Sequence, residues 1–137
     1  MRRRARARAI QALYAWDLAG RLSDVSLESF ADRLWSDLAV SRAERDVAYR
    51  LINVVQARIE EIDDGIAAAT RNWRLGRLGA IERAVLRLGS AELRKGDTPP
   101  RVVIQEAVTL AERFGTLESA RFVNGVLDAI ARQLGSL

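Results

Sequence analysis

Apolar residues recur at helical spacing through almost the whole chain, and this periodicity limits the fold more than any other feature. The 137-residue sequence contains two prolines, Pro99 and Pro100, which are adjacent. Because proline breaks a helix interior, their confinement to one place leaves room for long helices on both sides. Nowhere do valine, isoleucine and threonine alternate with polar residues over the length of a strand. The sequence therefore predicts an all-α fold.

Capping residues and helix breakers divide the chain into about six to seven predicted helices. Gly20 ends the first, because glycine readily takes the positive φ of a helix C-terminus. Ser41 and Glu44 form a predicted capping box that starts a long helix, and Pro100 pre-sets the first turn of a later one. Thr116 is placed to cap the last helix. These signals give helices over about residues 2–19, 26–39, 41–62, 81–93, 100–114 and 116–134.

The segment "TRNWRLGRLG", residues 70–79, interrupts this periodicity with two glycines. It is interpreted as the boundary between two small packed helical bundles, residues 1–72 and residues 73–137. Both belong to a single domain covering residues 1–137. A chain of this length with 49% hydrophobic residues can bury enough apolar surface to fold.

The composition removes most familiar catalytic and metal-binding chemistry. The chain has no cysteine and no histidine, so it lacks disulfides, thiolate nucleophiles, imidazole bases and the usual zinc ligands. No phosphate-binding glycine motif is present, and Glu60, Glu61, Asp63 and Asp64 are interpreted as a solvated helix face. No apolar run approaches the roughly 18 to 20 residues of a membrane span. We expect a cytoplasmic protein with no enzymatic activity, no cofactor, no metal site and no membrane contact.

Arginines make up five of the first eight residues and run directly into the first predicted helix. The formal net charge is +4 and would be −1 without them, and Lys95 is the only lysine among the 22 basic residues. Arginines at a helix N-terminus oppose the helix dipole, so they are not placed there for stability. Guanidinium groups fork onto phosphates and stack on bases, which favours nucleic acid over a membrane as the partner. The five residues are Arg2, Arg3, Arg4, Arg6 and Arg8.

Two other interpretations of the arginine-rich start remain open. It could be a solvated basic tail. It also resembles an organellar presequence, being amphipathic and free of acidic residues until Asp17. Ile10, Leu13 and Leu18 have the spacing of core positions, however, so this helix is expected to belong to the fold. Replacing all five arginines by glutamine is expected to weaken nucleic-acid binding and to leave the melting temperature nearly unchanged.

Aromatic residues beside basic ones indicate a second element of nucleic-acid binding. Single strands are held by base stacking as well as by phosphate contacts, at about 1–3 kcal/mol per base. Tyr14 follows the arginines, although taken alone it is more typical of a core position. Phe122 follows Arg121 and precedes Asn124 within the last predicted helix. Gly125 costs about 1 kcal/mol there relative to alanine, which indicates close approach of a ligand or, more simply, of another helix.

Three segments of the chain together resemble the bacterial NusB family of transcription antitermination factors. They are "RRRARARAIQALYAWDL" (residues 2–18), "RNWRLGRLGAIERAVLRLGSAELR" (residues 71–94) and "PPRVVIQEAVTLAERFGTLESARFVNGVLD" (residues 99–128). The third is the most specific, because "FVNGVL" follows a helix that ends in "FG". Together the segments cover about half of the chain.

The resemblance implies an all-helical protein of two three-helix bundles that binds boxA, a short single-stranded RNA element of ribosomal RNA leaders. Family members bind boxA together with NusE, a ribosomal protein of the small subunit, and the complex helps RNA polymerase to read through terminators. Some members self-associate and hide the RNA surface, so a homodimer is an alternative to the NusE complex. An exposed apolar face on the fourth or fifth predicted helix would suit either partner.

The resemblance also assigns roles to individual residues. Those assigned to RNA binding are Arg2, Arg3, Arg4, Arg6, Arg8, Gln11, Tyr14, Arg121, Phe122 and Asn124. Glu82 matches an acidic position near which NusE docks, with Arg83 and Arg87 beside it on the same helix. The two RNA-binding groups are expected to form one surface.

Two residues depart from the family pattern. Gln105 replaces the usual asparagine before "EA", and Leu117 occupies a position that is commonly polar or acidic; neither threatens the fold. The same fold occurs as an N-terminal appendage of RNA cytosine methyltransferases, but we expect a free-standing factor, because the sequence ends at Leu137 without a methyl-donor domain. A protein–protein adaptor with incidental, nonspecific RNA affinity remains the rival function.

Overall fold

The computed structural model describes residues 2–20, 26–36, 38–70 and 78–137. Within these ranges the backbone forms helices and connecting turns without a strand, which confirms the predicted all-α fold. The helices are α1 (Arg2–Leu18), α2 (Leu27–Ser36), α3 (Arg42–Ala57), α4 (Ile59–Ala69), α5 (Ala80–Lys95), α6 (Pro100–Phe114) and α7 (Leu117–Gln133). None of these described helices is long and apolar enough to cross a membrane.

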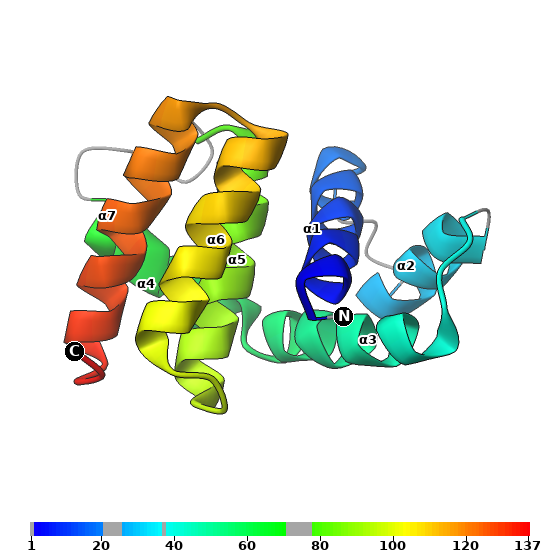
Figure 1. Cartoon of the computed structure of the whole chain (residues 1–137), viewed down its shortest axis with the longest axis horizontal. Helices are drawn as coiled ribbons and strands as arrows, with labels where there is room; N and C mark the ends of the chain where they lie inside the picture. Colours follow the sequence, from blue (N-terminus) through cyan, green and yellow to red (C-terminus); the bar gives the residue numbers. More distant parts are fainter. Residues whose placement is uncertain (1, 21–25, 37, 71–77) are drawn as a thin grey trace.

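Helix α5 joins two groups of helices (Figure 1). It packs against α1 and α3 in one group and against α4, α6 and α7 in the other, while α2 covers α1 and α3. Residues 84–93 of α5 are all buried, as expected for a helix enclosed on every side. The predicted boundary between residues 72 and 73 lies outside the described residues, so the division into two bundles stays a prediction.

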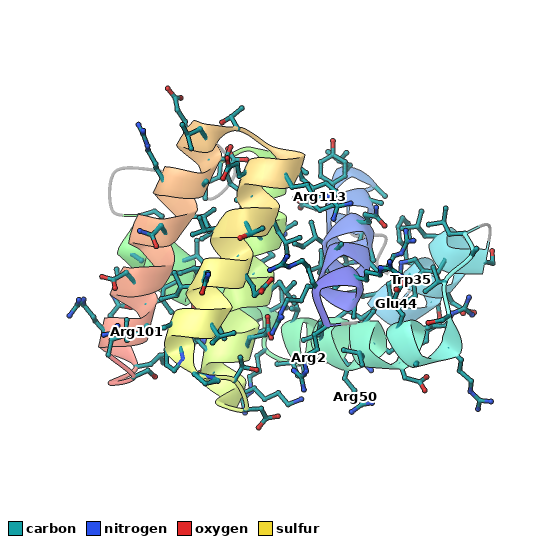
Figure 2. The ribbon with its side chains drawn as sticks, viewed as in Figure 1. Arg2, Trp35, Glu44, Arg50, Arg101 and Arg113 are labelled. Carbon is teal, nitrogen blue, oxygen red and sulfur yellow. The ribbon has the colours of Figure 1, made fainter. Side chains whose placement is uncertain are left out.

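Trp35 anchors α2, and its side chain is fully buried (labelled in Figure 2). The Trp35 and Tyr49 rings have centroids 5.1 Å apart and planes tilted by 59°. The Tyr49 hydroxyl on α3 also donates a 2.6 Å hydrogen bond to Asp32 Oδ1 on α2. Aromatic and polar contacts therefore fix α2 against α3 together.

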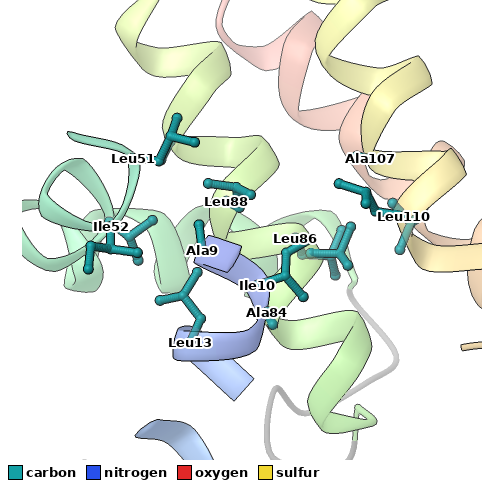
Figure 3. Close-up of a cluster of buried hydrophobic side chains, with 14 of the residues drawn as sticks. Ala9, Ile10, Leu13, Leu51, Ile52, Ala84, Leu86, Leu88, Ala107 and Leu110 are labelled. Carbon is teal, nitrogen blue, oxygen red and sulfur yellow. The ribbon is translucent and has the colours of Figure 1, made fainter. Parts of the chain in front are cut away.

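One cluster of buried apolar side chains runs through both groups of helices. Figure 3 shows part of it, with Ala9, Ile10 and Leu13 from α1, Leu51 and Ile52 from α3, Ala84, Leu86 and Leu88 from α5, and Ala107 and Leu110 from α6. Gly89 lets α5 and α7 approach closely, because a Cβ at this position would lie 2.8 Å from Leu127 Cδ1. The core is thus continuous across α5, and the close approach of α5 and α7 depends on that glycine.

The single helix predicted over residues 41–62 is two helices in the structure. Arg58 has φ −124° and ψ 27°, and its backbone N–H is shared between the carbonyls of Val54 and Val55. Helix α3 therefore ends at Arg58 and α4 begins there. Helix α4 packs against α5 and α7. The sequence hides this break, because apolar residues continue at helical spacing on both sides of Arg58, from Val55 to Ile62.

The predicted caps are confirmed, with one difference. Ser41 Oγ accepts from the backbone N–H of Glu44 at 3.2 Å. The Glu44 carboxylate does not return to the Ser41 backbone as a full capping box requires; it accepts a hydrogen bond from Arg8 on α1. At α7 the box is complete, with Thr116 and Ser119 bonding each other's backbone N–H groups.

Candidate nucleic-acid interface

The arginines of α1 surround the helix, and the structure places them in three different environments. The first turn of α1 contains no acidic residue. The positive charge of the arginines and the positive end of the helix dipole are therefore not neutralised within that turn. Successive residues of a helix are separated by 100°, so five arginines within seven positions cannot share one face. Their neighbours on α3, α5 and α6 therefore decide which of them face solvent.

Arg6 is buried inside the protein, with 4% of its surface exposed. Its Nε and Nη2 donate to the two carboxylate oxygens of Glu92 on α5, at 2.9 and 2.8 Å. These hydrogen bonds raise the pKa of Arg6 above its ordinary value, although burial opposes the shift. The position of Arg6 argues against the expectation that all five arginines can be replaced with the melting temperature nearly unchanged, since its removal would leave a buried carboxylate unpaired.

Arg3 and Arg8 reach solvent but are held by carboxylates. Arg3 donates from Nε and Nη2 to Glu106 on α6, both at 3.0 Å, while its side chain remains 62% exposed. Arg8 donates to Glu44 on α3 at 3.2 Å and to the side-chain oxygen of Gln11 at 3.2 Å. Both arginines can meet an external phosphate only by sharing or leaving these partners.

Arg2 and Arg4 are the arginines of this cluster that remain available. Both are exposed, and neither forms a hydrogen bond or an ion pair with any residue in the described ranges. Arg2 lies at the start of α1, next to α3 (Figures 1 and 2). Two full positive charges are thus presented at this end of the molecule.

The solvent-facing side of α1 continues from Arg4 toward the other end of the helix. Arg4, Gln11 and Leu18 are seven residues apart, so they lie along one line on the helix surface. Leu18 is 60% exposed, which corrects its prediction as a core residue, whereas Ile10 and Leu13 are buried as predicted. Tyr14 lies beside this line, partly buried against the core. This line has a positive charge at Arg4 and an exposed apolar side chain at Leu18.

The second predicted patch occupies the first turns of α7. Arg121 and Asn124 are exposed, and Phe122 is partly buried against the core. Phe122 and Glu82 both line an open pocket of about 250 Å³ between the beginnings of α5 and α7. The structure therefore brings together a residue predicted to contact RNA and one predicted to contact a protein partner.

Gly125 has no packing role within the described chain. A Cβ built there would have nothing within 4 Å, so close approach of another helix, the simpler explanation of this glycine, is wrong. The residue is exposed in the interior of α7 next to Asn124. A helix-weakening residue at an open surface position is compatible with an external ligand that comes close to the backbone.

Arg83 and Arg87 face inward. Arg87 is 2% exposed, and it pairs with Asp63 on α4 at 2.9 Å and with Asp17 on α1 at 3.4 Å. Arg83 Nε donates to Asp17 at 2.6 Å, and its Nη1 donates to the carbonyl of Leu78. These ion pairs tie the end of α1 and the middle of α4 to α5.

The interpretation of residues 60–64 as a solvated acidic face is wrong for Asp63, which accepts a partly buried hydrogen bond from Arg87. Glu60, Glu61 and Asp64 are exposed as predicted, although Glu61 also accepts from Arg94 at 2.9 Å. Among the described residues, no group of three or more metal-ligating side chains exists.

The two RNA-binding groups predicted to form one surface lie on α1 and α7, with α5 and α6 between them (Figure 1). Contacts of the first turn of α5 link the far end of α1 to the start of α7. Asp17 of α1 binds Arg83, and the adjacent Glu82 lines the Phe122 pocket. The arginine-rich start of α1 lies about 25 Å from the other end of the same helix, at 1.5 Å per residue. A ligand contacting both groups would therefore have to extend along the molecule.

Both the sequence and the fold match those of one known protein family. The sequence matches the profile of the NusB family over residues 3–132. The chain belongs to the NusB family. The transcription antitermination protein NusB of Solibacter usitatus (strain Ellin6076) is 40% identical over 136 residues, covering 97% of this chain and 90% of the relative.

Solved structures of the NusB family have the same architecture. A crystal form of T. maritima NusB superposes with a TM-score of 0.83 at 35% identity, covering 97% of this chain and 92% of that one. A chain from the crystal structure of the antitermination factors NusB and NusE in complex with dsRNA superposes with a TM-score of 0.82 at 32% identity. That match covers 96% of both chains. The expectation of family and fold from the three sequence segments is confirmed.

The sequence did not reveal the acidic residues that organise the site. Glu92, Glu106 and Glu44 decide which arginines of α1 are available, and none was predicted to do so. Each lies between 36 and 103 residues from its arginine, so no local pattern connects them. Glu44 alone carried a local signal, as the third residue of a predicted helix, and that signal indicated a cap.

Proposed function

We propose that this chain is a transcription antitermination factor that binds boxA-type single-stranded RNA of ribosomal RNA leaders together with NusE. In this role it promotes read-through by RNA polymerase, acts in the cytoplasm and catalyses no reaction. Membership of the NusB family supports the proposal, as does the relative solved with NusE and RNA. A homodimer that competes with NusE for the same face is a further state of the protein under this proposal.

The start of α1 carries the proposal. Arg2 and Arg4 are exposed there and have no carboxylate partner among the described residues, in a fold where Arg3, Arg6 and Arg8 are paired. Unpaired arginines at a helix N-terminus weaken the helix unless an anion neutralises them. The phosphates of an RNA strand are such anions, and the fork of the guanidinium group fits them. We therefore assign the phosphate contacts to Arg2 and Arg4 first, then to Arg3 and Arg8.

The selectivity for sequence is assigned to the start of α7 and the middle of α1. Asn124 presents an exposed amide that can both donate to and accept from base edges. Gly125 beside it leaves the helix backbone open to a close ligand. Gln11, Tyr14, Arg121 and Phe122 complete the proposed base-contacting set. Arg6 is assigned the positioning of α1 on α5 instead of an RNA contact, because it is buried against Glu92.

The partner surface for NusE is assigned to Glu82 and the pocket it shares with Phe122. Arg83 and Arg87 act there indirectly, since their guanidinium groups bind Asp17 and Asp63 and hold the first turns of α5 in place. A partner at Glu82 would lie next to RNA at Phe122. We therefore expect the two partners to bind cooperatively.

The proposal is tested by titrating a labelled boxA strand and its scrambled sequence with the protein, with and without NusE. We expect tighter binding to boxA and a further gain when NusE is present. Asn124→Ala should reduce the preference for boxA. The matched control is Gln133→Ala, which removes another exposed amide from α7 outside the proposed patch.

Equal binding of the boxA and scrambled strands, unaffected by NusE, would contradict the proposal. It would leave the rival function, an adaptor whose arginines hold nucleic acid without reading it. Loss of boxA preference in the Gln133→Ala control as well would also count against the assigned patch.

A further inference from the structure

Arg3 and Glu106 form an ion pair at the surface that differs from the buried pair one turn further along α1. Both Arg3 donors, Nε and Nη2, are directed at the two Glu106 oxygens at 3.0 Å. The Arg3 side chain is 62% exposed and that of Glu106 is 18% exposed, whereas Arg6 and Glu92 are 5% and 7% exposed. Water therefore reaches the Arg3 pair and is excluded from the Arg6 pair.

This exposure decides which of the two pairs can open. An ion pair in contact with water is weak, so an arriving anion can displace it. Opening the buried pair would leave a desolvated charge without a partner, which is far more costly. Arg8 and Glu44 are an intermediate case, because Glu44 is nearly buried and Gln11 also binds Arg8.

The donors that Glu106 occupies are the ones a phosphate would use. Carboxylate and phosphate oxygens accept the same pair of parallel hydrogen bonds from one edge of a guanidinium group. Hydrogen bonds from Arg3 hold the pKa of Glu106 below its ordinary value, so the carboxylate is ionised at neutral pH. Arg3 cannot offer this edge to RNA while Glu106 holds it.

We propose that Glu106 is an affinity-setting residue that competes with RNA phosphate for the Arg3 guanidinium. This inference rests on the proposed RNA-binding function. In the free protein Glu106 neutralises Arg3 and fastens the first turn of α1 to α6. An RNA strand that uses this edge of Arg3 must replace the Glu106 carboxylate with a phosphate. Arg3 therefore binds the strand only after other residues already hold it.

The test is the affinity of a labelled single-stranded RNA for Glu106→Gln, measured at several salt concentrations. We expect binding about two- to fivefold tighter, because the surface ion pair that competes for Arg3 is weak. The salt dependence should steepen by about 0.7 in d log K/d log [salt], as for one added phosphate contact on a single strand. Thermal unfolding of the variant confirms that it remains folded.

Three controls separate competition for Arg3 from a simple loss of negative charge. Glu112→Gln removes the same charge from an exposed residue of the same helix that has no partner in the described chain, and it should change affinity little. Glu106→Asp keeps the charge but shortens the side chain, so it should tighten binding almost as much as Glu106→Gln. In an Arg3→Gln background, Glu106→Gln should give no further gain.

Equal gains from Glu106→Gln and Glu112→Gln, or a gain that survives in the Arg3→Gln background, would overturn the inference. The effect of Glu106→Gln on affinity can be measured with the scrambled strand as well as with boxA, because competition between Glu106 and phosphate does not depend on base sequence. A protein that fails to prefer boxA, yet responds to Glu106→Gln as described, would overturn the proposed function and leave this inference standing. Absence of RNA binding by the unaltered protein would overturn both.

Discussion

Arg6 of α1 donates two hydrogen bonds to Glu92 of α5, at 2.9 and 2.8 Å, and both side chains are buried. Removing one member of such a pair leaves an uncompensated charge in the interior, which costs about 3–5 kcal/mol. We therefore expect Glu92→Gln and Arg6→Gln each to lower the free energy of unfolding by about this amount. Denaturant unfolding measures the loss.

Arg4→Gln is the control for this pair, since Arg4 is an exposed arginine on the same helix. It should leave the free energy of unfolding within about 0.5 kcal/mol of its original value. An Arg6→Gln variant as stable as Arg4→Gln would show that Arg6 is not held in the interior. It would then return Arg6 to the set of arginines available to RNA.

Two glycines in neighbouring helices are expected to respond to alanine in opposite directions. A Cβ at Gly89 would lie 2.8 Å from Leu127 Cδ1, and Leu127 is fully buried. Overpacking of this kind costs about 1–3 kcal/mol, which exceeds the gain in helix propensity. Gly125 has open space, so alanine there should stabilise α7 by up to about 1 kcal/mol.

Thermal and denaturant unfolding of Gly89→Ala and Gly125→Ala check these signs. If the backbone at Gly125 is approached by RNA, Gly125→Ala should weaken RNA binding while it raises stability. A stabilised Gly125→Ala variant with unchanged RNA affinity would place the ligand elsewhere. A stabilised Gly89→Ala variant would contradict the close packing of α5 on α7.

Tyr49 is expected to make stability fall at high pH. Burial and the hydrogen bond to Asp32 raise the pKa of Tyr49 to about 12, above the value of about 10 for an unfolded tyrosine. The folded state therefore holds this proton more tightly than the unfolded state does. The resulting stability is fully present below pH 10 and is lost as the pH rises through about 12.

Spectroscopic titration of phenolate absorbance tests this assignment. One of the two tyrosines should ionise near pH 12, and Tyr49→Phe should remove that transition together with its contribution to the pH dependence of unfolding. A transition near pH 12 that persists in Tyr49→Phe would assign it to the other tyrosine. It would also contradict the hydrogen bond from the Tyr49 hydroxyl to Asp32, which joins α3 to α2.

The helices and their caps could be predicted because their causes are local. Gly20, Ser41, Pro100 and Thr116 each lie within a few residues of the helix end they determine. The break at Arg58 could not be predicted, because no glycine or proline marks it and the apolar spacing continues across it. The exposure of Leu18 was missed since periodicity indicates which residues can be buried, but not where a covering helix ends.

The candidate site was predictable in type but not in detail. Five arginines in one segment indicated an anionic partner, and the structure leaves Arg2 and Arg4 exposed without partners in the described ranges. That Arg6 is buried follows from Glu92, which is 86 residues away in sequence and brought near by the packing of α1 on α5. Long-range pairing of this kind leaves no signal in a single sequence.

The salt dependence of RNA binding tests the central claim most directly, namely that the exposed arginines of α1 hold the phosphates. We compare the original protein with Arg2→Gln/Arg4→Gln and with the control Arg33→Gln/Arg42→Gln. The control removes two exposed arginines of α2 and α3 that have no side-chain partner among the described residues, on the side of α1 opposite α7 (Figure 1). The predicted result is a slope of log K against log [salt] that flattens by about 1.4 in the α1 variant, at about 0.7 per contact, and is unchanged in the control. Equal slopes for the original protein and the α1 variant, or equal flattening in both variants, would contradict the account.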